Sequence, residues 1–252
     1  MKHAKHSRPS HISKVGVALF TLIFLCVVVG VGIVYFHPSS SNSSQKNMSS
    51  EKTSSSTSES SKSDLPNVST ADWNLLLINR NHLQEENTPA LTQIDDVQVD
   101  SRIAENTRQF LEEARTIVPE EVLISGYRSK AEQTELYNQS LADLQAAGYS
   151  PEEAESLTQK QVQIPGAREH QTGLAIDMSA PEGQTDEIAA KIAEIAPKYG
   201  FILRYVEGKQ DITGVDFENW HYRYVGVENA QYIYQHNLVL EEYIDLLKAD
   251  GK

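Results

Sequence analysis

The sequence predicts an α+β domain in which helices surround a small, mostly antiparallel sheet. Short apolar runs of strand length mix with segments of helical periodicity, without the regular strand–helix alternation of a parallel α/β fold. Two successive strand candidates, at residues 201–205 and 220–225, are joined by a glycine-containing connection that suits antiparallel neighbours. The chain of 252 residues is long enough for one such domain with appendages.

The first 36 residues predict a membrane anchor. Residues 1–14 contain basic but no acidic side chains, and residues 15–36 carry no charge and consist mainly of Val, Leu, Ile and Phe. An apolar helix of about 20 residues spans a bilayer core. A cleaved signal peptide is the alternative, but its apolar region is normally about 7–15 residues long. The positive-inside rule makes residues 1–14 a cytoplasmic tail of a single-pass membrane protein, with the later residues extracellular and facing the cell wall.

Residues 37–70 predict a disordered linker between this anchor and a folded domain at residues 71–252. The segment from Ser39 to Ser63 contains 14 serines and only one large apolar residue, Met48. Such a composition buries too little apolar surface to offset the entropy of ordering the chain. We therefore expect a flexible tether.

Charge and cysteine content exclude several classes of partner and fold. The formal net charge is −13, and the basic residues of the tail make the remainder still more acidic. Because phosphate binding needs clustered Lys and Arg, nucleic acid is not expected as a partner. The single cysteine, Cys26, lies in the apolar run, so the domain has no disulfides. A monomer is favoured as the oligomeric state.

The elements follow from periodicity and end signals. Apolar runs predict strands at residues 73–79, 122–124, 174–178, 201–205 and 220–225. Helices are predicted to begin near residues 101, 130, 151, 185 and 227. Ser150 suits an N-cap with Pro151 at the first helical position, and Gly148 and Gly200 each suit the end of a helix. Residues 227–247 suit one helix or a pair.

Three side chains form a candidate zinc site: His170, Asp177 and His221. Two imidazoles and a carboxylate can hold zinc and leave one position open for water. His170 lies in a glycine-bounded loop, Asp177 ends a short apolar run, and His221 lies in another strand candidate. Taken singly, each has a more common structural role, as a hydrogen-bonded core histidine or a turn aspartate. Spacing alone therefore leaves both interpretations open.

Glu218 lies three residues before His221 and is the candidate general base. A carboxylate beside the metal, without being a ligand, could take a proton from water and pass it to a leaving amine. In a regular strand this spacing places the two side chains on opposite faces, so the hypothesis requires a bend or a bulge. The alternative is an ordinary exposed acid in an acidic chain.

The motifs resemble a known family when they are read in order. They are SGYR at residues 125–128 with Gln133, HQTGLAID at 170–177, GFILRY at 200–205 and ENWHYRYVG at 218–226. Together they resemble the VanY-type D-alanyl-D-alanine carboxypeptidases, a group that includes L,D-carboxypeptidases acting on peptidoglycan stem peptides. The resemblance covers roughly residues 70–248. It implies a zinc-dependent carboxypeptidase that removes the terminal D-Ala of peptidoglycan stem peptides.

The resemblance also implies roles for individual residues. The positions matching the zinc ligands are His170, Asp177 and His221. Glu218 matches the acid/base that activates water together with zinc, Arg128 the arginine facing the substrate carbonyl or terminal carboxylate, and Gln133 a substrate-side polar residue. A guanidinium suits this task because it pairs with carboxylates through charge-assisted hydrogen bonds.

One residue departs from the family pattern, and two alternative functions remain. Arg168 stands two positions before the first ligand, where the family commonly has serine, so substrate specificity could differ. An L,D-carboxypeptidase acting on the tetrapeptide stem uses the same chemistry on a different bond. A non-catalytic wall-binding module is the second alternative, although such a module would not need all of Glu218, His170, Asp177 and His221.

Overall fold

The computed structural model describes residues 64–252. The predicted tail and anchor, and most of the predicted linker, lie outside these residues. Within the described part, no helix has both the length and the apolar character needed to cross a membrane. The strands are β1 (Leu91–Ile94), β2 (Val97–Asp100), β3 (Val122–Ser125), β4 (Ala175–Ser179), β5 (Phe201–Tyr205) and β6 (Glu218–Tyr224).

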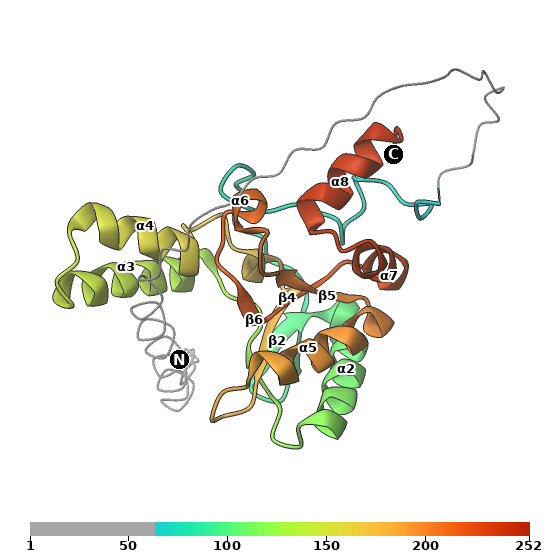
Figure 1. Ribbon diagram of the computed structural model, residues 1–252, viewed down its shortest axis with the longest axis horizontal. Helices are drawn as coiled ribbons and strands as arrows, with labels where there is room; N and C mark the ends of the chain where they lie inside the picture. Colours follow the sequence, from blue (N-terminus) through green and yellow to red (C-terminus); the bar gives the residue numbers. More distant parts are fainter. Residues whose placement is uncertain (1–63) are drawn as a thin grey trace, which may run out of the picture. The chain divides into compact units, whose positions relative to one another are not determined.

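Within residues 64–252, seven α-helices accompany the strands, and Figure 1 shows how they are arranged. They are α2 (Ala104–Ile117), α3 (Lys130–Ala146), α4 (Pro151–Gln161), α5 (Asp186–Ile195), α6 (Gln210–Thr213), α7 (Val227–Gln235) and α8 (Leu240–Ala249). Three 3₁₀ turns are η1 (Ser101–Ile103), η2 (Glu169–Thr172) and η3 (Ala196–Tyr199). The predicted α+β class is confirmed.

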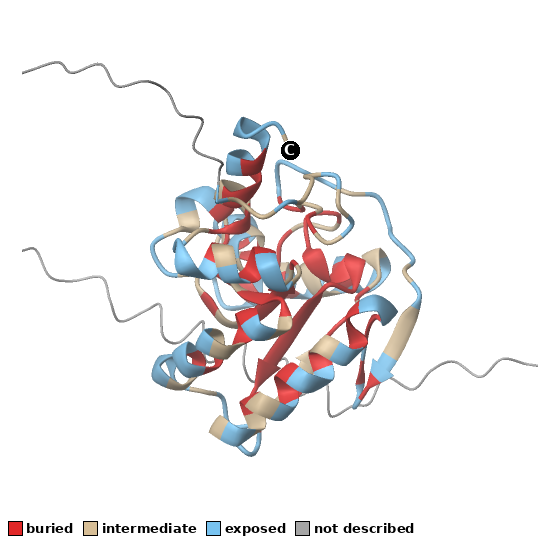
Figure 2. Cartoon of the chain, turned by 90° about the vertical axis from the view of Figure 1, so that its right-hand side faces the viewer, coloured by how far each residue is buried: buried red, intermediate tan, exposed pale blue. Residues whose placement is uncertain are grey.

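The main sheet has four strands in the order β3-β4-β6-β5, and every neighbouring pair is antiparallel. Helices α2 and α5 pack against each other, and α5 contacts β6. Helix α7 packs beside β5. Helices α3 and α4 pack against each other as a separate pair (Figure 1). The central strands are buried, while the helices are buried mainly on the side facing the sheet (Figure 2).

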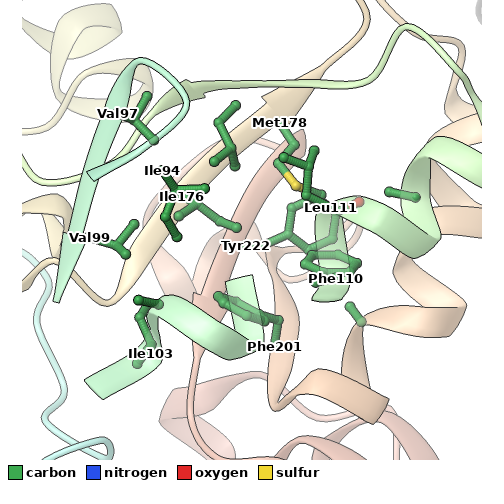
Figure 3. Close-up of a cluster of buried hydrophobic side chains, with 14 of the residues drawn as sticks. Ile94, Val97, Val99, Ile103, Phe110, Leu111, Ile176, Met178, Phe201 and Tyr222 are labelled. Carbon is green, nitrogen blue, oxygen red and sulfur yellow. The ribbon is translucent and has the colours of Figure 1, made fainter. Parts of the chain in front are cut away.

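The larger apolar core lies between α2 and one face of the sheet. Phe110 of α2 stacks on Phe201 of β5 and meets Tyr222 of β6 edge-on, with ring centroids 5.3 and 5.1 Å away. Ile176 and Met178 of β4 join this cluster (Figure 3). Because alternate residues of a strand face opposite ways, Ala175, Asp177 and Ser179 of the same strand are directed away from this core.

Helix ends are where the sequence signals and the structure agree best. Ser129 and Ser150 both form capping boxes, at the starts of α3 and α4, and Pro151 occupies the first turn of α4 as predicted. The predicted helix from residue 185 is capped by Thr185 but divides into α5 and η3, with Pro197 in the first turn of η3. Residues 227–247 form the pair α7 and α8.

The strand predicted at residues 73–79 is wrong. The segment forms turns after Asp72, and its only ladder contact is a single bridge between Asn79 and His82. Leu75 and Ile78 are nevertheless buried, which explains the apolar run. The carbonyls of Asn74 and Leu76 accept hydrogen bonds from the guanidinium of Arg223 instead of from a neighbouring strand.

A short hairpin, β1–β2, precedes α2 in a region where the sequence analysis predicts no strand. Val97 and Val99 alternate with polar residues and are buried, and Asp95 adopts φ 47° in the two-residue turn. A positive φ is characteristic of two-residue hairpin turns, and Asp tolerates it better than most residues. The hairpin also supports the site, because Gln98 accepts a hydrogen bond from the backbone N–H of Tyr127.

Glu121, just before β3, should make stability depend on pH. Its side chain is fully buried, neither carboxyl oxygen has a hydrogen-bond partner among the described residues, and burial raises its pKa to about 7, opposed by Arg115. A raised pKa in the folded state means that stability is complete below about pH 4.5 and declines as the pH rises through 7. The shift corresponds to about 3 kcal/mol at most.

We expect Glu121→Gln to remove this decline. Urea unfolding at pH 5 and at pH 8 measures the free energy of unfolding. From pH 5 to pH 8 this free energy should fall more for the wild type than for Glu121→Gln. Glu120→Gln, an exposed neighbour, is the matched control and should follow the wild type. Parallel wild-type and Glu121→Gln curves would show that Glu121 is not the titrating group.

Candidate active site

The three predicted metal ligands converge on one buried point. Asp177 of β4 lies directly opposite His221 of β6 in the antiparallel register, and His170 comes from η2, just before β4. Nε2 of His170 is 3.2 Å from Oδ2 of Asp177, and Nδ1 of His221 is 2.9 Å from Oδ1 of the same carboxylate. One potential ligand atom from each residue lies within 4.8 Å of the others.

His170 is held in the orientation that a metal ligand needs. Its Nδ1 lies 2.6 Å from the carbonyl oxygen of Gly126 and can only donate there, which leaves Nε2 as the free lone pair. Burial lowers the pKa of His170 to about 4, with the neighbouring Asp177 acting in the opposite direction. The imidazole is therefore neutral near pH 7, as coordination requires.

Two glycines allow this close packing. A Cβ on Gly126 would lie 2.2 Å from the carbonyl oxygen of Gln98, so no larger residue fits there. Gly173 ends η2 in the left-handed region, with φ 69°, and a Cβ there would lie 2.7 Å from the backbone nitrogen of Asp100. The glycines of two sequence motifs thus pack the His170 turn against the end of β2.

His221 is oriented by a second carboxylate. Its Nε2 lies 3.4 Å from Oε2 of Glu169, so an N–H at Nε2 leaves Nδ1 directed at Asp177. Burial and Arg168 act to lower the pKa of His221, but the hydrogen bonds to Asp177 and Glu169 outweigh them and raise it. An arrangement in which a ligand histidine contacts an outer carboxylate is characteristic of metal sites.

Glu169 is itself held by two buried arginines. Its Oε1 accepts from Nε of Arg204 at 2.9 Å and from Nη1 of Arg223 at 2.8 Å. Arg204 also pairs with Glu241 of α8 through two hydrogen bonds of 2.7 and 2.9 Å. Burial acts to raise the pKa of Glu169, but the arginines and His221 hold it well below the ordinary value. Glu169 is therefore charged.

The residues present fit a zinc ion. Nε2 of His170 and Oδ2 of Asp177 are buried and have no hydrogen-bond partner within residues 64–252, which is costly unless another group satisfies them. Burial acts to raise the pKa of Asp177, but the two histidines hold it well below its ordinary value. Two imidazole nitrogens and a carboxylate oxygen match the ligand preference of zinc at a site with one open position.

Glu218 reaches the cluster through the bulge that its spacing requires. Between β5 and β6, Leu203 pairs with Tyr222 but Tyr205 pairs with Glu218, so β6 contains extra residues at this point. The carboxylate of Glu218 consequently lies 3.6 Å from Nδ1 of His221. Burial raises its pKa, with Arg168 and His221 acting in the opposite direction.

Arg128 follows β3 and is held by two side chains. Its Nη1 donates to Oε1 of Gln133 at 2.9 Å, and its Nη2 donates to the hydroxyl of Ser125 at 2.8 Å. The amide nitrogen of Gln133 donates to the carbonyls of Val162 and Gln163. The polar ends of Gln133 are thus occupied, and the contacts support a role in orienting Arg128. The contact of Gln133 with substrate that the sequence analysis expects stays a prediction.

Sequence reasoning missed Glu169, which directly precedes the HQTGLAID motif, and Ser125, which begins the SGYR motif. Glu169 is next to a predicted ligand, His170, but an acid in an acidic chain gives no signal of burial. The two buried arginines that would have revealed it lie 35 and 54 residues further along the chain. Arg168 was recognised as unusual in sequence, and the structure places it within the site.

The α+β domain contains a buried His–Asp–His cluster that could hold a metal ion, with a neighbouring carboxylate and a buried arginine, and this set of groups is compatible with a peptidase site. The comparisons with known proteins agree. The family model described as VanY, D-alanyl-D-alanine carboxypeptidase, matches residues 96–227. A D-alanyl-D-alanine carboxypeptidase of Enterococcus faecalis is 36% identical over 181 residues, covering 70% of this chain and 68% of the relative. The chain belongs to the VanY family of D-alanyl-D-alanine carboxypeptidases.

Solved structures share the fold. VanYB in complex with D-alanine-D-alanine matches with a TM-score of 0.65 and 36% identity, covering 69% of this chain and 98% of that one. A vancomycin-resistance D,D-pentapeptidase VanY variant in complex with Zn(II) matches with a TM-score of 0.64 and 35% identity, over 69% and 99%. The LD-carboxypeptidase LdcB matches with a TM-score of 0.58 and 29% identity, over 69% and 86%.

Proposed function

We propose that the chain is a zinc-dependent carboxypeptidase that removes the terminal D-Ala from peptidoglycan stem peptides. The observation that carries this proposal is the buried cluster of His170, Asp177 and His221, with the carboxylate of Glu218 only 3.6 Å from Nδ1 of His221. The VanY relatives and the zinc-containing structural neighbour support it. D-alanine-D-alanine, which VanYB binds, is the terminus that such a substrate presents.

The ligand residues are prepared for a metal by their neighbours. The carbonyl of Gly126 and the carboxylate of Glu169 each occupy one ring nitrogen of a histidine, so the other nitrogen faces Asp177. Zinc held there would supply the Lewis acidity that polarises a carbonyl and makes water nucleophilic near neutral pH. A site with three protein ligands keeps one position open for this purpose.

Glu218 would transfer the proton. Its carboxylate lies beside the ligand cluster without belonging to it, so it can accept a proton from the attacking water and later deliver that proton to the departing amine. Burial raises the pKa of Glu218 although Arg168 and His221 oppose it, and a raised pKa makes a carboxyl group a better proton carrier near neutral pH.

Arg128 would stabilise the negative charge that develops on the scissile carbonyl oxygen. Its guanidinium is buried and fixed by Gln133 and Ser125, so little reorganisation is needed when charge develops. The arginine also shares its surroundings with Asp177 and Glu218, which raise its pKa, while burial and Arg168 lower it to about 10. It remains a cation at neutral pH.

Stem-peptide cleavage with and without metal tests the proposal. Purified full-length protein should release D-Ala from a pentapeptide ending in D-Ala-D-Ala, as read from product masses. Exhaustive chelation should abolish release, and one equivalent of zinc should restore it. A wild-type protein that holds no zinc and cleaves no stem peptide would instead support a non-catalytic wall-binding module.

Removal of D-Ala from the tetrapeptide stem is the second candidate. The likeness to the LD-carboxypeptidase LdcB, at 29% identity, favours it. The two reactions differ in the chirality of the residue before the cleaved bond and need the same residues for hydrolysis. Parallel incubation with pentapeptide and tetrapeptide would separate them, because only the preferred peptide should be consumed at low enzyme concentration.

We further propose that the enzyme acts outside the cell, tethered to the membrane. The uncharged segment 15–36, the basic residues before it and the serine-rich linker support this localisation. Protease added to intact cells, stripped of their wall under osmotic protection, should then cleave the domain. Resistance until the membrane is permeabilised would contradict the assigned orientation.

A further inference from the structure

We propose that Arg168 determines substrate specificity by binding the free terminal carboxylate of the peptide. The proposal rests on the proposed function, since only a carboxypeptidase needs to recognise that group. Arg168 precedes η2 and is only 4% exposed. A buried guanidinium requires an anionic partner, because an unpaired buried charge is strongly destabilising.

The partners of Arg168 in the structure are groups that the chemistry needs. Nη1 and Nη2 lie 3.3 Å from Oε1 and Oε2 of Glu218, a paired contact with one carboxylate. Nη2 also lies 3.4 Å from Nδ1 of His221. Glu218 must face water to accept its proton, and Nδ1 has a single lone pair for a metal. Coordination of a metal by Nδ1 would therefore remove the contact between Arg168 and His221, and a turn of Glu218 toward water would weaken the paired contact. Arg168 would then need another acceptor.

A substrate carboxylate is the partner that would replace them. It offers the same two oxygens in the same planar geometry as Glu218, which suits the fork of a guanidinium. Arg168 also has a spare donor, because its Nε is buried and finds no hydrogen-bond partner in the part of the chain that the structure describes. The guanidinium can thus pass from one carboxylate to another without losing its charge compensation.

The charges of the site leave room for this anion. The guanidinium groups of Arg128 and Arg168 balance the carboxylates of Asp177 and Glu218, and all four are buried. A bound divalent metal adds two positive charges. A substrate carboxylate and the negative charge developing on the carbonyl oxygen would neutralise them. Since Arg128 is already fixed by Gln133 and Ser125, we assign the carbonyl to Arg128 and the terminal carboxylate to Arg168.

Two forms of one substrate test the assignment in the full-length, zinc-loaded protein. They are a stem peptide ending in D-Ala as the free acid and the same peptide with a C-terminal amide. We expect the wild type to prefer the acid. Arg168→Gln should lower kcat/KM for the acid by about 10- to 100-fold, mainly through KM, because hydrogen bonds between charged groups contribute that much. Its kcat/KM for the amide should fall less than that for the acid, because the amide lacks the carboxylate. The part of the loss that both peptides share measures the contact between Arg168 and Glu218.

The controls separate this role from others. Arg168→Lys keeps the charge but loses the planar fork, so it should fall between wild type and Arg168→Gln. Arg108→Gln removes an exposed arginine of α2 and should change nothing. Zinc content and the melting temperature establish that each variant is folded and loaded. An equal loss for acid and amide, mainly in kcat, would place Arg168 in support of Glu218 and overturn the proposal.

Failure of the proposed function would be recognised separately. If the wild type cleaves neither peptide, the calorimetric affinities of acid and amide still test Arg168. A wild-type preference for the acid that Arg168→Gln abolishes would support carboxylate binding. Equal affinity of the wild type for both forms would overturn it.

Discussion

Glu218→Gln is expected to lower kcat by about 10²- to 10⁴-fold while the protein still binds one zinc per chain. Glutamine preserves the shape of the side chain but can neither accept the proton of water nor deliver it to the leaving amine. The ligand atoms of His170, Asp177 and His221 are unaffected, because Glu218 is their neighbour and not a member of the cluster. Single-turnover kinetics and elemental analysis measure the two effects.

Two further variants serve as controls for Glu218→Gln, one that should lose zinc and one that should behave like the wild type. His221→Ala should lose both zinc and activity, since it removes a ligand and leaves Asp177 and Glu169 without their shared imidazole. Glu194→Gln, at an exposed position of α5, should resemble the wild type. Full activity in Glu218→Gln would remove Glu218 from the mechanism. Loss of zinc in that variant would make Glu218 a contributor to metal binding.

Much of the fold could be predicted from local signals. Helix starts were recognisable because Ser129, Ser150 and Thr185 cap them with side chains only three residues from their partners. The strand at residues 201–205 was predicted with its observed bounds. Such contacts are local, so the sequence displays both partners together.

Elements that depend on distant partners were less predictable. Leu75 and Ile78 of the segment 73–79 are buried, but the backbone carbonyls of Asn74 and Leu76 accept hydrogen bonds from Arg223, some 150 residues away in the chain, and not from a neighbouring strand. The hairpin β1–β2 could have been found from the alternation of Val97, Gln98 and Val99 after a pair of aspartates. The many polar residues of the hairpin made this alternation hard to recognise.

The site itself was predictable from motifs but not from spacing. His170 lies in the turn η2 and Asp177 lies in the middle of the following strand, β4. Only the register of β4 against β6 brings His221 opposite Asp177. The bulge that turns Glu218 toward the cluster was a stated requirement, and the structure contains it. The ion pairs of Glu169 and Arg168 join segments 35 to 54 residues apart, so no local pattern reveals them.

Glu169→Gln is expected to lower the free energy of unfolding by about 3–5 kcal/mol, because it removes one charge from a buried ion-pair network. Arg204 would keep Glu241 as a partner, but Arg223 would retain only backbone carbonyls and a neutral amide. The same change weakens the hydrogen bond to Nε2 of His221. Zinc affinity should therefore fall by about 10- to 100-fold, as is typical for outer partners of ligand histidines.

Urea unfolding of the metal-free protein measures the first effect, and competition with a chelator measures the second. Glu187→Gln is the matched control, because Glu187 forms an exposed pair with Lys191 on α5 and such pairs contribute about 0–1 kcal/mol. A stability loss below about 1 kcal/mol would mean that the arginines find other compensation. A large stability loss with unchanged zinc affinity would make Glu169 a structural residue alone. Loss of both would establish that one buried carboxylate couples the core at α8 to the orientation of a metal ligand.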